Sequence, residues 1–146
     1  MLITDGTGVP VGMLVASAQQ AEVRLAEATL ATVQVQGQRG RPRTRPQRLV
    51  CDRGYDSRRW RQQLRGRGIS CCIPPRRLPP PTKRKRRGRP VGYDRAVYAR
   101  RYIVERSFAW LLANRRIVVR WERRLEGYRG FVLLAMAMIC LNRLLQ

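Results

Sequence analysis

Residues 49–73 decide the fold, and they begin Leu49-Val50-Cys51-Asp52-Arg53-Gly54-Tyr55-Asp56-Ser57. The first three residues have the apolar character of a short buried strand, which Asp52 ends, and the turn-forming residues after them lead into a helix that ends at Gly68. We expect Asp56 or Ser57 to cap that helix. A second apolar run follows at residues 69–73. This order predicts a βαβ unit, in which the two strands lie parallel.

The segments on either side of this unit are expected to add a hairpin and three helices. Residues 1–17 are predicted to form the hairpin, with Asp5-Gly6-Thr7-Gly8 at its turn. Apolar residues recur at helical spacing at about residues 18–33, 94–112 and 128–145. An Arg-rich connection is expected between the last two helices. The 146 residues, 44% of them hydrophobic, suffice for one compact core, so we predict a single α/β domain.

The last predicted helix contains the longest apolar run, Phe131 to Leu141. This run is about half of the roughly 20 residues that a membrane-spanning helix needs. We therefore expect a buried helix, no membrane segment and a cytoplasmic protein. Trp60, Trp110 and Trp121 are likewise expected in the core, in preference to stacking on nucleic-acid bases.

The chain is strongly basic. Lys and Arg number 31 against nine Asp and Glu, which gives a formal net charge of +22 and a pI near 11.7. Such an excess indicates a polyanionic partner. Two segments rich in Gly, Pro and Arg, at residues 36–47 and about 75–92, are predicted to be mobile basic loops. We expect residues 36–47 and residues 83–89 within the second segment to contact phosphates without reading sequence, and the alternative is a solvated run of charge.

Histidine is absent, and the four cysteines form no C-x-x-C pair. A zinc site of the usual ligand spacing is therefore not expected. The absence of histidine also excludes every catalytic pair in which histidine activates a serine or a cysteine. Any chemistry must rest on the nine carboxylates.

Two carboxylates stand out by their positions. Asp52 ends an apolar strand, and carboxylates at the C-terminal ends of such strands point into the crevice where α/β proteins bind ligands. The alternative is that Asp52 only opens an Asp-Arg-Gly turn, and the sequence leaves both interpretations open. Glu105 shares a predicted helical face with Tyr98 and Arg101. An ordinary ion pair between Arg101 and Glu105 would account for these two residues on that face but not for Tyr98.

These residues occur in an order that characterises a known family. Residues 49–57 resemble the second-aspartate motif, an apolar strand followed by D-x-G-Y-D, of insertion-sequence transposases that have a ribonuclease-H-like DDE catalytic domain. Tyr98, Arg101 and Glu105 match the family's Y-x2-R-x3-E signature. Residues 130–136 are similar to its closing helix, so the resemblance spans essentially the whole chain.

The resemblance implies both a fold and a site. The fold is a ribonuclease-H-like mixed sheet with flanking helices, of which this chain forms the C-terminal part and lacks the first strand. Asp52 and Glu105 are the implied catalytic carboxylates and the implied ligands of Mg²⁺ or Mn²⁺. The residues that we expect to contact DNA are Tyr98, Arg101, Lys83, Arg84, Lys85, Arg86, Arg87, Arg115 and Arg116.

The chain departs from the family pattern in two places. Leu112 stands where the signature continues with a lysine, seven positions after the glutamate. The first catalytic aspartate would lie on a strand before the hairpin, so its counterpart is missing, and Asp5 aligns better with the hairpin turn. A two-metal site clamped only by Asp52 and Glu105 is expected to cleave DNA weakly or not at all.

The partners implied by the resemblance are the transposon ends and target DNA, a separately encoded N-terminal half that restores the missing aspartate, and a second copy of the chain on DNA. We expect the protein to be associated with the nucleoid. Two other functions remain open. A non-catalytic DNA-binding remnant of a transposon would share the charge but need no metal, and a ribosomal or RNA-packaging protein would prefer structured RNA.

Overall fold

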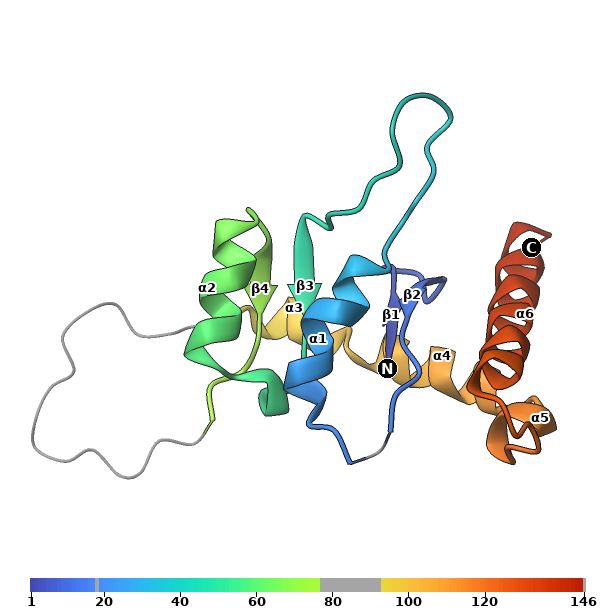
Figure 1. The fold of residues 1–146 in the computed structure, drawn as a ribbon. Coiled ribbons are helices and arrows are strands. Elements are labelled where there is room, and N and C mark those ends of the chain that lie inside the picture. The colour runs from blue at the N-terminus through green and yellow to red at the C-terminus, as the bar shows by residue number, and fades with distance from the viewer. Residues whose placement is uncertain (18, 77–92, 146) are drawn as a thin grey trace, which may run out of the picture. The chain divides into compact units, whose positions relative to one another are not determined.

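The computed structural model describes residues 1–17, 19–76 and 93–145 (Figure 1). The backbone forms two compact units. The central unit comprises residues 45–101, and the discontinuous unit comprises residues 1–44 together with 102–146. The chain leaves the discontinuous unit after residue 44 and returns to it at residue 102. The expected single domain stays a prediction.

The central unit contains the predicted βαβ arrangement. Strand β3 (Arg48–Val50) pairs in parallel with β4 (Ser70–Cys72), and helix α2 (Arg58–Gly66) connects them (Figure 1). The helix begins where predicted, because the Ser57 hydroxyl accepts a hydrogen bond from the Trp60 amide. Trp60, Leu64, Ile69 and Ile73 are all buried. These apolar side chains give the unit its core.

The predicted continuous helix at residues 94–112 is wrong. Helix α3 (Arg95–Ala99) belongs to the central unit, and helix α4 (Tyr102–Leu112) begins the returning part of the discontinuous unit. The amides of Arg100 and Arg101 donate to carbonyls three residues back, which tightens the last turn of α3 and ends it. Tyr98 and Glu105 therefore lie on different helices, and they do not form the single helical stripe that their spacing indicated.

The discontinuous unit begins with the predicted hairpin. Strand β1 (Leu2–Thr4) pairs antiparallel with β2 (Pro10–Met13), with Leu2 opposite Met13. Asp5 closes the turn, since its Oδ1 accepts hydrogen bonds from the amide and hydroxyl of Thr7, both at 2.8 Å, and from the Val9 amide at 2.9 Å. Burial raises the pKa of Asp5, but these hydrogen bonds outweigh it and hold that pKa below its usual value.

The rest of this unit is helical. Helix α1 (Glu22–Ala31) follows the hairpin, and the expected Arg-rich connection after α4 contains the short helix α5 (Arg115–Val118). Helix α6 (Leu125–Leu144) closes the chain. The core joins the hairpin to the C-terminal helices and consists of Leu2, Met13, Leu111, Ile117, Val132, Ala135 and Ile139.

The turn of the hairpin is tied to two of these helices. The Thr7 carbonyl accepts hydrogen bonds from Arg106 on α4 and from Arg143 on α6, each at 2.8 Å. The Ser107 hydroxyl lies 2.7 Å from the Gly8 carbonyl. Gly8 has φ +97°, and a Cβ there would lie 3.1 Å from the Ser107 hydroxyl oxygen. Glycine is therefore required both by the backbone conformation and by the close approach of α4.

Helix α6 is not the buried helix that the sequence indicated. Val132, Ala135 and Ile139 are buried, whereas the leucines and the methionine on the other side are exposed. The helix is also longer than the apolar run within it, and by length and composition it could cross a membrane. A single such helix is weak evidence of a membrane span. The prediction failed because burial depends on what the rest of the molecule offers to pack against.

The basic segment 36–47 has more structure than a free loop. Val35 and Arg43 form an antiparallel bridge, with N to O distances of 2.9 and 2.8 Å, at the base of an exposed turn. The described strands otherwise form two two-stranded sheets, one antiparallel and one parallel. A mixed α/β fold is therefore confirmed, while a single ribonuclease-H-like sheet remains a prediction.

Candidate catalytic carboxylates and nucleic-acid interface

Asp52 follows strand β3 directly and begins the short 3-10 turn η1 (Arg53–Tyr55). Its Oδ1 accepts hydrogen bonds from the Arg53 amide at 2.6 Å and from the Tyr98 hydroxyl at 3.3 Å. The residue is exposed to solvent. Both interpretations of Asp52 are thus compatible with the geometry, because the carboxylate caps a turn and still faces outward at the carboxyl end of a parallel strand.

Tyr98 brings helix α3 to this carboxylate, across 46 residues of sequence. The Tyr98 ring packs edge to face against the Tyr93 ring, with 5.4 Å between the two ring centroids. The Arg101 guanidinium lies 6.0 Å from the centroid of the Tyr98 ring. Burial and the neighbouring Asp52 carboxylate raise the pKa of Tyr98 above its usual value. The hydroxyl therefore stays protonated at neutral pH and can donate to Asp52. The structure shows a contact between Tyr98 and Asp52, and the predicted contact of Tyr98 with DNA stays a prediction.

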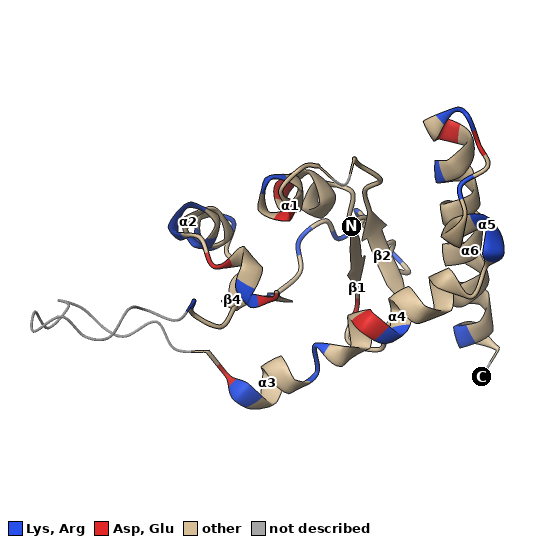
Figure 2. Ribbon diagram, turned by 90° about the horizontal axis from the view of Figure 1, so that it is seen from below, with Lys and Arg blue, Asp and Glu red and all other residues tan. Residues whose placement is uncertain are grey.

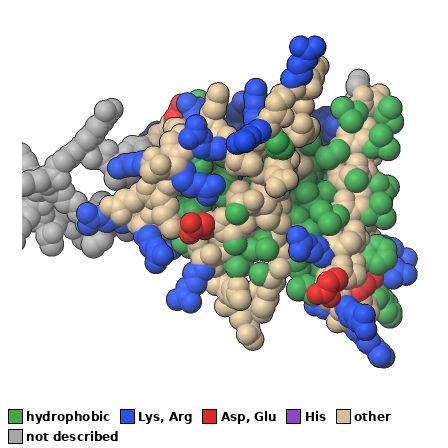
Figure 3. Space-filling model, turned by 45° about the horizontal axis from the view of Figure 1, so that its top comes forward, with side chains coloured by type: hydrophobic (Ala, Val, Ile, Leu, Met, Phe, Trp, Pro, Cys, Tyr) green, Lys and Arg blue, Asp and Glu red, His purple; other side chains and the backbone are tan. Residues whose placement is uncertain are grey.

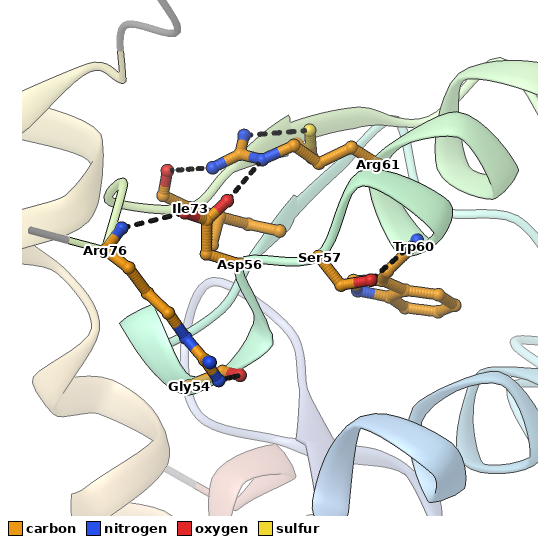
Figure 4. Close-up of polar contacts among 8 residues, drawn as sticks. Gly54, Asp56, Ser57, Trp60, Arg61, Ile73 and Arg76 are labelled. Atoms are coloured by element: carbon orange, nitrogen blue, oxygen red, sulfur yellow. Dashed lines mark hydrogen bonds and ion pairs between the residues drawn. The ribbon is translucent and has the colours of Figure 1, made fainter. Parts of the chain in front are cut away.

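A buried arginine organises the loop that follows Asp52 (Figure 4). Arg61, on α2, donates from Nε to Asp56 Oδ1 at 2.8 Å and from Nη2 to the Ile73 carbonyl at 2.8 Å. Only 7% of Arg61 is exposed. The guanidinium thus joins the D-x-G-Y-D segment to the end of β4, where its planar fork satisfies two acceptors at once.

Asp56 is held from a second side as well. Its Oδ2 accepts a hydrogen bond from the Arg76 amide at 2.7 Å, and the Arg76 side chain donates to the Gly54 carbonyl at 3.0 Å. Burial raises the pKa of Asp56, but the hydrogen bonds from Arg76 and Arg61 outweigh it and lower that pKa below its usual value. Asp56 is therefore ionised at neutral pH, and residues 52–57 have a fixed shape.

Glu105, the other predicted catalytic residue, lies at an exposed position on α4. Its helix belongs to the discontinuous unit, whereas Asp52 belongs to the central unit. Within its own unit α4 is well anchored, since the next two residues, Arg106 and Ser107, bind the hairpin turn. The structure therefore shows each carboxylate on a defined element, and their meeting in one site remains a prediction.

Within the described residues, few side chains are placed to bind a metal ion together. No three side chains of Asp, Glu, Cys or His come together there. Asp52 and Glu105 offer the hard carboxylate oxygens that Mg²⁺ prefers, but Mg²⁺ sites in proteins combine such ligands with water and with substrate oxygens in octahedral geometry. The chemistry of these residues fits a divalent cation, whereas their number does not complete the carboxylate set of a two-metal site.

The predicted DNA contacts have several different outcomes. Lys83, Arg84, Lys85, Arg86 and Arg87 lie outside the described residues. Arg115 and Arg116 are exposed on α5, as a DNA contact requires. Arg116 also forms an ion pair with Glu122 at 3.2 Å and lies 5.1 Å from the Phe131 ring centroid. Its cation is therefore already partly engaged within the fold.

Sequence reasoning missed a basic face on α2 (Figure 2). Arg58, Arg59 and Arg65 are exposed on this helix, while Arg61 is buried. The helical spacing of the arginines could have indicated this face, because the apolar positions Trp60 and Leu64 define the opposite side.

Trp60 is in the core as predicted, but Trp121 is exposed, so its expected burial is wrong. An exposed tryptophan beside arginines can stack on a base.

Comparisons with known proteins agree with the motif order. A family model described as the transposase DDE domain matches residues 1–142. A protein of Burkholderia cepacia, named as a transposase for insertion sequence element IS402, is 35% identical over 144 residues. The match covers 98% of this chain and 62% of that protein, so the chain spans less than two thirds of its relative's length. No solved structure matches. The chain belongs to the family of transposases with a DDE domain.

Proposed function

We propose that the chain acts in DNA transposition as part of a transposase catalytic domain, with Asp52 and Glu105 as two of its metal-binding carboxylates. The observation that carries this proposal is the position of Asp52. It stands at the carboxyl end of a parallel strand, and Tyr98 of the family signature donates to it. Two motifs that are 46 residues apart in sequence therefore meet at one carboxylate, which a turn-forming aspartate alone does not require.

The reaction of such a domain is phosphoryl transfer at the DNA backbone. Mg²⁺ or Mn²⁺, when bound, would activate the attacking oxygen and stabilise the leaving oxygen. The residues of this chain would hold the cation through carboxylate oxygens and keep the Asp52 side chain in place through Tyr98. Because only two candidate carboxylates are present, we expect weak or no strand cleavage by this chain alone.

The missing carboxylate would come from outside this sequence. More than a third of the IS402 relative's length has no counterpart here. We propose that this remaining length, supplied in the same polypeptide or separately, carries the first aspartate on a strand of a ribonuclease-H-like sheet. Strand β1 pairs only with β2 among the described strands, so one edge of β1 is available for that strand.

DNA is the partner that the charge favours. Arg58, Arg59 and Arg65 form an exposed basic face on α2, and the whole chain carries +22. Contacts of this kind neutralise phosphates without reading bases, so they suit both transposon ends and target DNA. Such a protein would be concentrated on the nucleoid. A second copy would be recruited to the paired ends.

A second candidate function is non-catalytic DNA binding by a remnant of a transposase. The observation that favours it is the short donor set, since among the described residues no three potential ligands gather. Both candidates predict salt-sensitive DNA binding. They differ in whether a divalent metal ion changes the DNA covalently.

The test is nicking of a supercoiled plasmid with Mg²⁺ or Mn²⁺ by the parent chain and by Asp52→Ala, Glu105→Ala and Glu126→Ala variants. Glu126 is an exposed acid on α6 and serves as the matched control. Metal-dependent nicking that is lost in the first two variants and kept in the third supports catalysis. Salt-sensitive binding without nicking supports the second candidate. Tighter binding to structured RNA than to duplex DNA would contradict both.

A further inference from the structure

The segment between helix α1 and strand β3 contains a short basic arm, residues 35–43. The arm is closed at its base, where Val35 and Arg43 exchange two backbone hydrogen bonds of 2.9 and 2.8 Å. Within it, the Gln36 side chain donates to the Gly40 carbonyl at 3.4 Å. Every residue of the arm is exposed, and Figure 1 shows the segment projecting beyond α1 and the hairpin. A run of charge that is merely solvated needs no such closure.

The tip of the arm is Arg39-Gly40-Arg41, and Pro42 follows it. Gly40 has φ +88°, a left-handed conformation that favours glycine, and a Cβ added there would meet nothing within 4 Å. Proline fixes its own φ and restricts the backbone of the residue before it, which is Arg41. The tip is therefore a bend of bare backbone that is flanked in sequence by two arginines.

The two arginines of the tip are available to a ligand. Arg39 and Arg41 are exposed, and neither side chain forms a hydrogen bond or an ion pair with another described residue. Between Glu27 and Asp52 the chain has five arginines and no acidic residue. Figure 3 shows the same excess on one face of the molecule, where the blue side chains of Lys and Arg dominate the charged groups. The ligand of the tip is therefore anionic or rich in hydrogen-bond acceptors.

The sequence of the tip occurs twice in the chain. Arg-Gly-Arg-Pro stands at residues 39–42 and again at residues 87–90, which lie outside the described residues. Chance accounts poorly for two copies, because the chain has only 12 glycines and nine prolines among its 146 residues. A loop that only has to stay solvated needs no fixed order of these residues. The recurrence therefore indicates a specific contact.

We propose that the tip of the basic arm enters the minor groove of A·T-rich DNA, with Arg39 and Arg41 as the residues that contact the groove. The minor groove of B-DNA is about 6 Å wide, so it admits a segment that has no side chain at its centre more readily than a bulkier one. Gly40 provides that centre. The negative potential of a narrow minor groove attracts arginines that insert into it.

Hydrogen-bond chemistry selects A·T pairs over G·C pairs. A guanidinium has only donors, and the floor of an A·T minor groove presents only acceptors, N3 of adenine and O2 of thymine. A G·C pair adds the amino group of guanine, which is a donor that no arginine can satisfy. Runs of A·T pairs also have a narrow groove, which strengthens the attraction. The arm should therefore distinguish base composition, whereas contacts to phosphates do not.

Binding in the minor groove rests on DNA being the partner, as proposed above, but it requires neither Asp52 nor Glu105. It also assigns more to this segment than the sequence indicated, which was contact with phosphates that does not read bases. The charge of the chain allows it to bind DNA of any sequence. The arm would concentrate it at A·T-rich sites among these.

Fluorescence anisotropy of the full chain with three labelled duplexes tests the proposal. The duplexes contain a central run of A·T, G·C or inosine·cytosine pairs. Inosine lacks the amino group that guanine has in the minor groove, so it presents the acceptors of an A·T pair there, while its major groove resembles that of G·C. We expect the A·T and inosine duplexes to bind about fivefold more tightly than G·C, or more, since one good base-edge contact discriminates by roughly that factor.

The disrupting variant carries Arg39→Gln and Arg41→Gln. Both residues are exposed, so the variant is expected to fold. Arg58→Gln with Arg59→Gln is the matched control, since it removes the same charge from the exposed basic face of α2. We expect the arm variant to lose most of the preference for the A·T and inosine duplexes. The control should bind all three duplexes more weakly and keep that preference.

Because residues 87–90 repeat the sequence of the tip, each measurement is also made in a background with Arg87→Gln and Arg89→Gln. In that background the arm is the remaining Arg-Gly-Arg-Pro. The expected result is a preference for A·T that persists there and disappears when the arm substitutions are added.

Several outcomes would overturn the proposal. Equal binding of the three duplexes in either background, or a preference that the arm variant keeps, would leave the arm as a phosphate contact. Binding of the inosine duplex as weakly as G·C would place the contact in the major groove. The absence of any DNA binding would overturn the proposed function as well, whereas DNA binding without the preference would overturn only the role of the arm.

Discussion

Replacing Arg61 by methionine tests how the loop after Asp52 is held. Methionine keeps much of the apolar stem of the arginine but removes the guanidinium. The change deletes the hydrogen bonds to Asp56 Oδ1 and to the Ile73 carbonyl, both 2.8 Å long. Ile73 is fully buried, so its carbonyl would lose this partner in a dry environment.

The magnitude follows from those two bonds. A hydrogen bond to a charged group contributes about 1.5–3 kcal/mol, and an unsatisfied buried carbonyl costs about 1–3 kcal/mol. Removing one partner of a buried ion pair costs about 3–5 kcal/mol. The Asp56 side chain is 22% exposed and keeps the Arg76 amide, so the lower end applies. We expect Arg61→Met to lower the free energy of unfolding by about 3 kcal/mol.

Urea denaturation followed by tryptophan fluorescence measures this loss, since Trp60 is buried one residue before Arg61. With a slope of about 2 kcal/mol per molar, the midpoint should fall by roughly 1.5 M. Arg65→Met is the control, because Arg65 is exposed on the same helix. Arg61→Lys should recover only part of the loss, since an ammonium lacks the planar fork. A midpoint for Arg61→Met within about 0.2 M of the Arg65→Met midpoint would refute the reasoning.

Three further predictions follow from the geometry. Because the pKa of Asp56 is lowered, the stability that its carboxylate contributes is complete above the usual carboxyl pKa of about 4. This stability is lost as pH falls through the lower pKa of the folded state. In a plot of the urea midpoint against pH, Asp56→Asn should therefore make the decline at acid pH less steep. Gly8→Ala should lower the thermal midpoint of unfolding, by about 1–3 kcal/mol in free energy, because φ is +97° and Ser107 is close; an unchanged midpoint would contradict this. The exposed arginines of α2 are Arg58, Arg59 and Arg65. Replacing all three by glutamine should make the plot of log binding constant for duplex DNA against log salt concentration shallower, by about 0.9 for each phosphate that is no longer neutralised. Fluorescence anisotropy at several salt concentrations measures this slope.

Local structure could be predicted where neighbouring residues determine it. The βαβ unit and the hairpin turn at Asp5 are confirmed, and the cap lies at Ser57, one of the two residues expected to provide it, because each feature depends on groups within a few residues. The family could also be predicted, since two motifs in order carry more information than either does alone. The roles of Asp52 and Glu105 as catalytic residues stay predictions.

The remaining features depend on interactions between distant residues. Nothing in the sequence distinguishes Arg61 from the rest of the 29 arginines. Its guanidinium holds the loop after Asp52 only because the end of β4 lies beside it in the fold and accepts a hydrogen bond from it. The contact between the Tyr98 hydroxyl and Asp52 could not be predicted, because nothing in the neighbouring sequence shows that α3 reaches this carboxylate. The interruption between α3 and α4 has no glycine or proline to mark it. The exposure of Leu134, Met138 and Leu141 on α6 cannot be inferred from their hydrophobicity, which predicts burial on every side of the helix alike.

The tie between the hairpin turn and the two C-terminal helices has a consequence for synthesis. A polypeptide emerges from the ribosome N-terminus first, at about 5–20 residues per second. The central unit is one continuous segment, residues 45–101, so it can fold as it emerges. The hairpin is made before the central unit but cannot complete its hydrogen bonds until Arg143 has been added. The chain should therefore fold from its middle outward, with the strand edges of the hairpin needing protection from aggregation until the last helix closes over the core.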